Sequence, residues 1–150
     1  MVTSMGLSLD LPGDASAPAV ARRFVRESIS DGRLRADALI VVSELVANAW
    51  QHGAPPLRMV LELDQDAPSA TRLSIKVMNH CPEGSTCVPE LILGGRPDGH
   101  GGRGVDLVAH IADDWGWQVA GSTMTVWAQL TSQEPVVLHK PSSDSWAATA

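Results

Sequence analysis

The chain has no apolar run of about 18 residues or more, the length that a transmembrane helix needs, and no basic-then-apolar leader of the secretory kind. We therefore expect neither a membrane span nor a secretory signal, and the cytoplasm is the expected location. Basic residues are also scarce, because 11 Lys and Arg face 17 Asp and Glu and leave a net charge of -6. Non-specific nucleic-acid binding needs clustered Lys and Arg, so direct binding to nucleic acid is not expected.

Cysteine is nearly absent. The only two, Cys81 and Cys87, lie in a loop that contains Pro and Gly, where they could close a small disulfide or hold a metal together with His80. Two cysteines without a second pair make a poor zinc site, and a cytosolic chain rarely keeps a disulfide. Two free thiols are expected.

The size and composition predict one domain. The chain has 150 residues, 44% of them hydrophobic, which is enough for a single core. We place this domain at residues 1–130. The tail, residues 131–150, contains Pro135, Pro141 and several serines without a hydrophobic period, and is expected to be loosely held.

One helical segment carries an unusual polar stripe. Glu44, Asn48 and His52 are spaced i, i+4 and i+8, so they share one face of a helix. The opposite stripe is apolar and consists of Val42, Leu45, Val46 and Ala49. Such a helix can bury one side in a core while its polar residues face a cavity. An acidic residue and an amide four positions apart are suited to a magnesium nucleotide site.

A glycine cluster follows later in the chain. Residues 99–104 read Gly-His-Gly-Gly-Arg-Gly and lead directly into an apolar helical pattern. Glycines allow backbone N–H groups to close on an anion, and the start of a helix adds partial positive charge, so phosphate is the expected guest. Either signal alone is weak, but the two in this order are far more specific.

The remaining pattern predicts a mixed order of helices and strands. The first strand is expected at the edge of the sheet, and each later pair of strands is expected to form a hairpin. The first helix is expected to be capped by Asp14 or Ser16 and ended by Gly32. The expected strands are 7–11, 57–63, 73–79, 115–120 and 123–130, and a short helix is expected at 105–112. Pro and Gly interrupt residues 80–102, a length typical of a functional lid or a disordered segment.

Four segments together carry a family resemblance. They read Ser-Glu-Leu-Val-Ala-Asn-Ala-Trp-Gln-His-Gly (43–53), Gly-Arg-Gly-Val-Asp-Leu-Val (102–108), Ala-Asp-Asp-Trp-Gly-Trp (112–117) and Thr-Val-Trp-Ala-Gln-Leu (125–130). The chain resembles the anti-sigma-factor serine kinase branch of the GHKL ATPases, the superfamily that includes histidine kinases, gyrase B and MutL. The likeness spans about residues 7–130, and the first two segments, the N-box and the glycine box, are its specific parts.

The resemblance implies a Bergerat-type ATP-binding fold. This is an α/β (α+β) two-layer sandwich with a mixed, mostly antiparallel sheet, helices on one face, and ATP held between helices under a lid. By motif, Asn48 would bind Mg²⁺ through its side-chain oxygen, and Glu44 would act as the general base. For His52 two interpretations stay open: a place near the phosphates, or interaction with the helix dipole alone.

The resemblance assigns further ligand contacts. Gly102 and Gly104 match glycines whose backbone approaches the phosphates, and Val105 belongs to the same box. Arg103 either reaches a phosphate or is simply solvated. Thr125 matches a strand threonine near the adenine pocket.

The chain departs from the family pattern at Asn79. Relatives end this strand with an aspartate that accepts a hydrogen of the adenine amino group, whereas this chain continues as Asn79-His80-Cys81-Pro82-Glu83. A carboxamide oxygen still accepts a hydrogen bond, but the charge is lost. Because charge-assisted hydrogen bonds are roughly twice as strong as neutral ones, ATP affinity is expected to fall by about one to two orders of magnitude. A second hypothesis is that Asn79, which both donates and accepts, admits guanine nucleotides.

The resulting hypothesis is an ATP- and Mg²⁺-dependent protein-serine kinase that regulates transcription. It would phosphorylate a serine of an antagonist protein, bind a sigma factor in the alternate state, and form a homodimer as its relatives do. The alternative is a catalytically weakened or nucleotide-free protein-interaction module that keeps the GHKL fold. Asn79 favours the module, whereas Glu44 and Asn48 favour the kinase.

Overall fold

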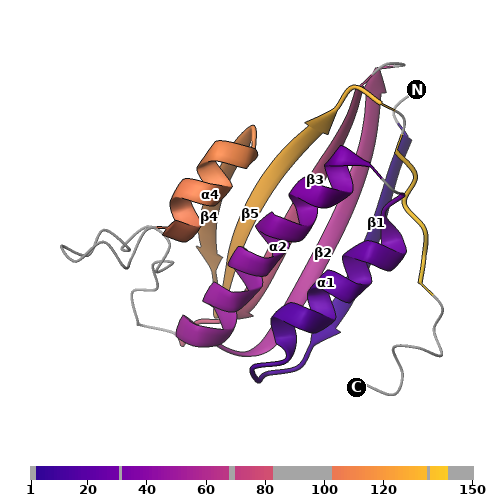
Figure 1. Cartoon of the computed structure of the whole chain (residues 1–150). Coiled ribbons are helices and arrows are strands. Elements are labelled where there is room, and N and C mark those ends of the chain that lie inside the picture. The colour runs from indigo at the N-terminus through magenta and orange to yellow at the C-terminus, as the bar shows by residue number, and fades with distance from the viewer. Residues whose placement is uncertain (1–2, 31, 68–69, 83–102, 135, 142–150) are drawn as a thin grey trace.

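A computed structural model describes residues 3–30, 32–67, 70–82, 103–134 and 136–141. Its elements are β1 (Thr3–Leu11), α1 (Ala17–Ser28), α2 (Arg33–His52), β2 (Ala54–Ala67), β3 (Ala70–His80), α4 (Arg103–Ile111), β4 (Asp114–Ala120) and β5 (Thr123–Ser132). The five strands form one open sheet in the order β1-β2-β3-β5-β4. The described helices cover one face of this sheet (Figure 1). The expected α+β architecture is confirmed, and it is consistent with a two-layer sandwich.

Every pairing between the described strands is antiparallel. A mixed sheet was expected. β3 and β4 do run in the same direction, but β5 lies between them and pairs with both, so no parallel pair forms. The two predicted hairpins, β2–β3 and β4–β5, are confirmed, as is the position of β1 at an edge of the sheet.

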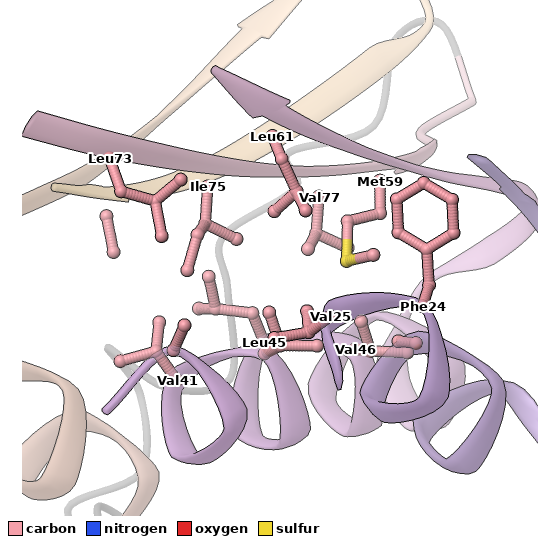
Figure 2. Packing of buried hydrophobic residues seen from close by; sticks show 14 of the residues in the cluster. Phe24, Val25, Val41, Leu45, Val46, Met59, Leu61, Leu73, Ile75 and Val77 are labelled. Atoms are coloured by element: carbon pink, nitrogen blue, oxygen red, sulfur yellow. The ribbon is translucent and has the colours of Figure 1, made fainter. Parts of the chain in front are cut away.

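The core lies between the sheet and the helices (Figure 2). Successive side chains of a strand point to opposite faces, so every second residue of β2 and β3 reaches the core. The labelled side chains from the sheet are Met59, Leu61, Leu73, Ile75 and Val77, and those from α1 and α2 are Phe24, Val25, Val41, Leu45 and Val46. All ten are buried. The open face of the sheet is more polar and includes an ion pair between Lys76 and Glu62 at 3.0 Å.

The boundary between α1 and α2 differs from the expectation. α1 ends at Ser28, because Ile29 adopts an extended conformation (φ -105°, ψ 129°) and forms a bridge with Leu138. Gly32 does not end α1 but directly precedes α2, with φ at 147°. This is a conformation that other residues rarely adopt, so glycine is required where the chain turns into the second helix.

Asp14 and Ser16, the two predicted capping residues, both lie at the start of α1, but they bond to each other and do not cap the helix through a side chain. Ser16 occupies the N-cap position, but its side chain makes no capping hydrogen bond. Its hydroxyl and its backbone N–H both donate to the carboxylate of Asp14. These two hydrogen bonds, the hydroxyl first, lower the pKa of Asp14 from its usual value.

The segment after β5 is more ordered than expected over its described part. β5 extends to Ser132, and beyond it Val136 and Leu138 are buried while Val137 is 53% exposed. The backbone N–H of His139 donates to the carbonyl of Ser28. Three alternating residues are too few to read as a strand from sequence, yet they suffice to hold this segment against the end of α1.

Ser28 gives a first prediction about stability. Its side chain is fully buried, and its hydroxyl has no hydrogen-bond partner in the described structure. A buried hydroxyl without a partner costs free energy, so Ser28→Ala should raise the free energy of unfolding by about 1 kcal/mol. Urea denaturation should show a higher midpoint at an unchanged slope.

Ser30 provides the matched control. Its hydroxyl oxygen accepts a hydrogen bond from the backbone N–H of Val137 at 3.1 Å. Ser30→Ala removes that acceptor and should lower the urea midpoint. If Ser28→Ala also lowered the midpoint, its hydroxyl would have a partner in solution, and the prediction would be wrong.

Candidate functional site

The candidate site is built on α2, which contacts both α1 and α4. One side of α2 is buried in the core, as predicted. On the flank that carries the polar stripe, Glu44 is half-buried, Asn48 is only 8% exposed, and His52 is exposed at the last residue of the helix. Burial is therefore concentrated at Asn48, and His52 lies outside the buried part of the stripe.

Asn79 is the second buried carboxamide. It lies next to the end of β3, on the face that also presents Leu73, Ile75 and Val77 to the core, and it is 2% exposed. Its Nδ2 atom donates to the carbonyl of His80 at 3.0 Å. Its Oδ1 atom is buried and has no hydrogen-bond partner in the described structure.

Gly53 brings the end of α2 against Asn79. A Cβ atom at position 53 would lie 2.5 Å from Cγ of Asn79 and 2.7 Å from the carbonyl oxygen of Ala49. Side chains do not approach so closely, so this contact requires glycine. In the sequence, Gly53 stands out only as the last residue of the N-box segment 43–53. Its packing role has no local signal, because it depends on Asn79, which lies far from Gly53 in the sequence.

The partnerless oxygen of Asn79 has a chemical implication. Native proteins satisfy nearly all of their buried polar atoms, and an unsatisfied acceptor costs about 1–3 kcal/mol. A ligand that donates an N–H to this oxygen would remove that cost. Asn79 is thus a candidate hydrogen-bond acceptor for a ligand bound near the end of α2.

The end of β3 is held in place by its neighbours. Asn79 pairs with Met124 and His80 with Thr123 in β5, and the backbone N–H of Cys81 donates to the carbonyl of Ser122 at 2.7 Å. Cys81 is buried and disulfide-bonded. This corrects the expectation of two free thiols; the only other cysteine of the sequence, Cys87, lies outside the described residues.

The glycine box is described only in part. α4 begins at Arg103, so the predicted helix directly after the glycine cluster is present. Gly102 and the connection 83–102 lie outside the described residues, as do the side chains of Arg103 and Val105, so their roles stay predictions. The first turn of α4 lies toward the same end of the molecule as the last turn of α2 (Figure 1).

Thr125 is not brought to this site. In β5 the buried residues Met124 and Val126 face the helices, so Thr125 between them lies on the opposite face of the sheet. There it pairs with Met78 and Gln118. The expected place of Thr125 near a pocket between sheet and helices is therefore corrected, because strand alternation turns it away from α2.

Metal binding at this site would depend on few protein ligands. Across the described ranges, no three His, Cys, Asp or Glu side chains gather as a metal cluster. The oxygen of Asn48 is a donor that a hard cation such as Mg²⁺ accepts. The residues present thus fit a cation that takes one ligand from the protein here and further oxygens from a bound phosphate.

No protein-family model matches the chain, and no curated protein matches it. Of the helices in the described residues, none is both long and apolar enough to cross a membrane. The functional proposal therefore depends on the motifs and on the geometry of α2 and β3.

Proposed function

We propose that this chain is an ATP-binding regulatory protein of the anti-sigma-factor serine kinase type, with the Bergerat-type fold of the GHKL superfamily. The observation that carries the proposal is a pair of buried carboxamides: Asn48 on the N-box helix, and Asn79, whose side-chain oxygen lacks a partner. The order of the N-box and the glycine box supports the same function.

The two carboxamides would bind different parts of the nucleotide. The Asn79 oxygen would accept a hydrogen of the adenine amino group, and the Asn48 oxygen would bind Mg²⁺. When bound, Mg²⁺ neutralises charge on the phosphates and helps to position them. Backbone N–H groups of residues 102–105 would bind phosphate oxygens at the start of α4.

Glu44 would serve the transfer step. The hydroxyl oxygen of a serine attacks the γ-phosphorus, the bond from that phosphorus to the β-phosphate oxygen breaks, and ADP leaves. The serine proton passes to the carboxylate of Glu44, which is half-buried on the same stripe as Asn48. Positioning and charge neutralisation would supply most of the rate.

The proposed partners follow from the resemblance alone. They are a serine-bearing antagonist protein and a sigma factor, bound by a homodimer in the cytoplasm. One observation favours a second candidate function, a protein-interaction module that does not transfer phosphate: residue 79 is an asparagine, whereas the family that the chain resembles has an aspartate there.

Titration calorimetry with ATP, in the presence and absence of Mg²⁺, tests the proposed nucleotide site. Magnesium-dependent binding supports the kinase and justifies a search for a serine-bearing substrate among captured partners. A Kd of about 1 mM corresponds to a binding free energy of about -4 kcal/mol. If the chain binds no ATP even at about millimolar nucleotide, the protein-interaction module is the remaining candidate function.

Asn79→Asp tests how the base is recognised. The substitution restores a charge-assisted hydrogen bond, so ATP should bind about 10- to 100-fold more tightly than to the parent. In the nucleotide-free protein the new carboxylate is buried without a partner, so its Tm should fall, and saturating ATP should restore it. Calorimetry and thermal denaturation measure the two effects.

Equal ATP affinities of the parent and Asn79→Asp would show that position 79 does not contact the base. GTP titrated in parallel tests the guanine hypothesis. That hypothesis fails if GTP binding to the parent stays at background.

A further inference from the structure

A groove runs along β1, which is an edge strand of the sheet. Its walls are residues 5–9 of β1, Phe24 of α1, and the pair Lys140 and Pro141, which lies beside β1 (Figure 1), and they enclose about 530 Å³. Side chains of a strand alternate between its two faces, yet five consecutive residues of β1 line this groove. Because these five residues share only the backbone edge, the groove exposes that edge and not just one face of the sheet.

The backbone of β1 is suited to accept another strand. Among the described strands, β1 pairs with β2 alone. In an antiparallel pair, every second residue directs its N–H and C=O groups away from the partner strand. Residues 4–9 read Ser-Met-Gly-Leu-Ser-Leu, without the charges or the proline that commonly protect an edge strand from further pairing.

The groove is apolar on the helix-facing side. Met5, Leu7 and Leu9 pair with buried residues of β2, so they lie on this side, where Phe24 also lines the groove. Met5 is 41% exposed, and the two leucines are only partly buried. Because neighbouring strands place side chains of one face next to each other, every second side chain of an added strand would contact this apolar wall.

The groove also carries one positive charge. Lys140 is the charged residue among its described lining residues, and it makes no ion pair within the described part of the chain. The single charged residue of β1, Asp10, is already paired with Arg58 at 3.2 Å. A carboxylate is therefore the complementary group that an occupant of the groove would supply.

We propose that the groove binds an extended acidic segment of a partner protein, which adds to β1 as a further strand of the sheet. The peptide backbone bonds to the edge of β1, alternate apolar side chains pack on Met5, Leu7 and Phe24, and a carboxylate pairs with Lys140. Residues 5–9 cover about 14 Å along the strand, so about five residues of the partner lie in the groove. This inference is independent of the proposed nucleotide site.

A second copy of this chain fits the groove less well. Two copies related by a two-fold axis contact each other through the same patch, so pairing of their β1 strands would bring two Lys140 side chains to one interface. The only carboxylate on β1, that of Asp10, is already engaged by Arg58. An acidic segment of another protein removes this mismatch of charge.

Fluorescence anisotropy with a synthetic peptide tests the proposal on the full-length chain. The acidic probe is fluorescein-labelled Ser-Val-Asp-Val-Ser-Val-Asp-Val-Ser, and a basic probe has lysine at both aspartate positions. The parent should prefer the acidic probe by up to about fivefold, the upper range for an exposed ion pair, and Lys140→Glu should reverse the preference. No binding of the acidic probe at about millimolar protein, or an unreversed preference, would overturn the proposal.

Backbone methylation of the acidic probe tests strand addition without any substitution in the protein. In an added strand, every second residue directs its N–H toward β1. One probe is N-methylated at its valines, and another is N-methylated at the residues between them. One of the two should lose binding while the other retains it. Equal affinities of the two methylated probes would show that the peptide does not pair with the edge of β1.

Met5→Glu and Val119→Glu form a matched pair of variants. Both residues are 41% exposed on the helix-facing side of an edge strand, but Val119 belongs to β4. Met5→Glu should bind the acidic probe severalfold more weakly than the parent, whereas Val119→Glu should bind it equally well. Both variants should bind ATP as the parent does, so failure of the groove and failure of the nucleotide site are distinguishable.

Sedimentation velocity of the same variants tests for a second copy in the groove. Met5→Glu and Val119→Glu should keep the oligomeric state of the parent. If Met5→Glu alone converted a dimer into a monomer, the groove would be the interface between two copies, and the proposal would be wrong.

Discussion

Replacing Asn48 by alanine should weaken magnesium-dependent ATP binding by at least about 100-fold relative to the parent. This corresponds to a loss of about 2.7 kcal/mol of binding free energy. The side-chain oxygen of Asn48 is the proposed protein ligand to Mg²⁺, and alanine has no oxygen to replace it. Without the cation, the negative charges of the phosphates stay unneutralised in the site. Calorimetric titration with ATP and Mg²⁺ measures the effect.

Two variants control for loss of the fold. Asn48→Asp keeps an oxygen ligand of nearly the same size, so it should retain magnesium-dependent binding. Gln51→Ala removes an exposed side chain one turn away on the same helix and should bind ATP as the parent does. If Asn48→Ala remained folded and bound ATP normally, Asn48 would be a core amide and not a metal ligand.

Replacing Glu44 by glutamine should slow phosphate transfer by about 10²- to 10⁴-fold, the usual contribution of a general base. Glutamine has the same size but accepts no proton. The Kd for ATP should stay within about threefold of the parent value, because a general base contributes to the transition state and not to ground-state binding. Basal ATP hydrolysis, in which water takes the place of the serine hydroxyl, is the measurement.

Asp37 is the matched acidic residue for this experiment. It is half-buried on the same helix, seven positions before Glu44, and therefore on nearly the same face. Asp37→Asn should hydrolyse ATP at the parent rate. If Glu44→Gln hydrolysed ATP at the parent rate, Glu44 would not be the general base, although the proposed nucleotide site would still stand.

The elements that could be predicted from sequence are those with a sustained hydrophobic period. α2 has an apolar stripe over several turns, and the two hairpins alternate over six residues or more, so their positions were predicted correctly. The first part of β1 was missed because Thr3, Ser4 and Gly6 give it no alternation; its register is set by the partner strand β2. Val136 and Leu138 were missed because two buried positions do not define a period.

The candidate site was predictable only in part. Asn48 and Asn79 were identified from the sequence as candidate ligand residues by their motifs, and the structure shows that both side chains are buried. Their relation through Gly53 was not predictable, because it depends on how the end of a helix meets the end of a strand. Thr125 was placed by motif similarity alone, although the alternation of Met124 and Val126 already indicated the opposite face.

The close contact between Gly53 and Asn79 constrains how the two positions can vary among homologues. Any residue larger than glycine at position 53 would require a side chain shorter than asparagine at position 79, so the two positions should covary in size. An exchange of asparagine for aspartate changes charge but hardly changes volume. The charge that residue 79 would present to the proposed base can therefore change by a single substitution without repacking, whereas a change of size at either position needs a second, compensating substitution.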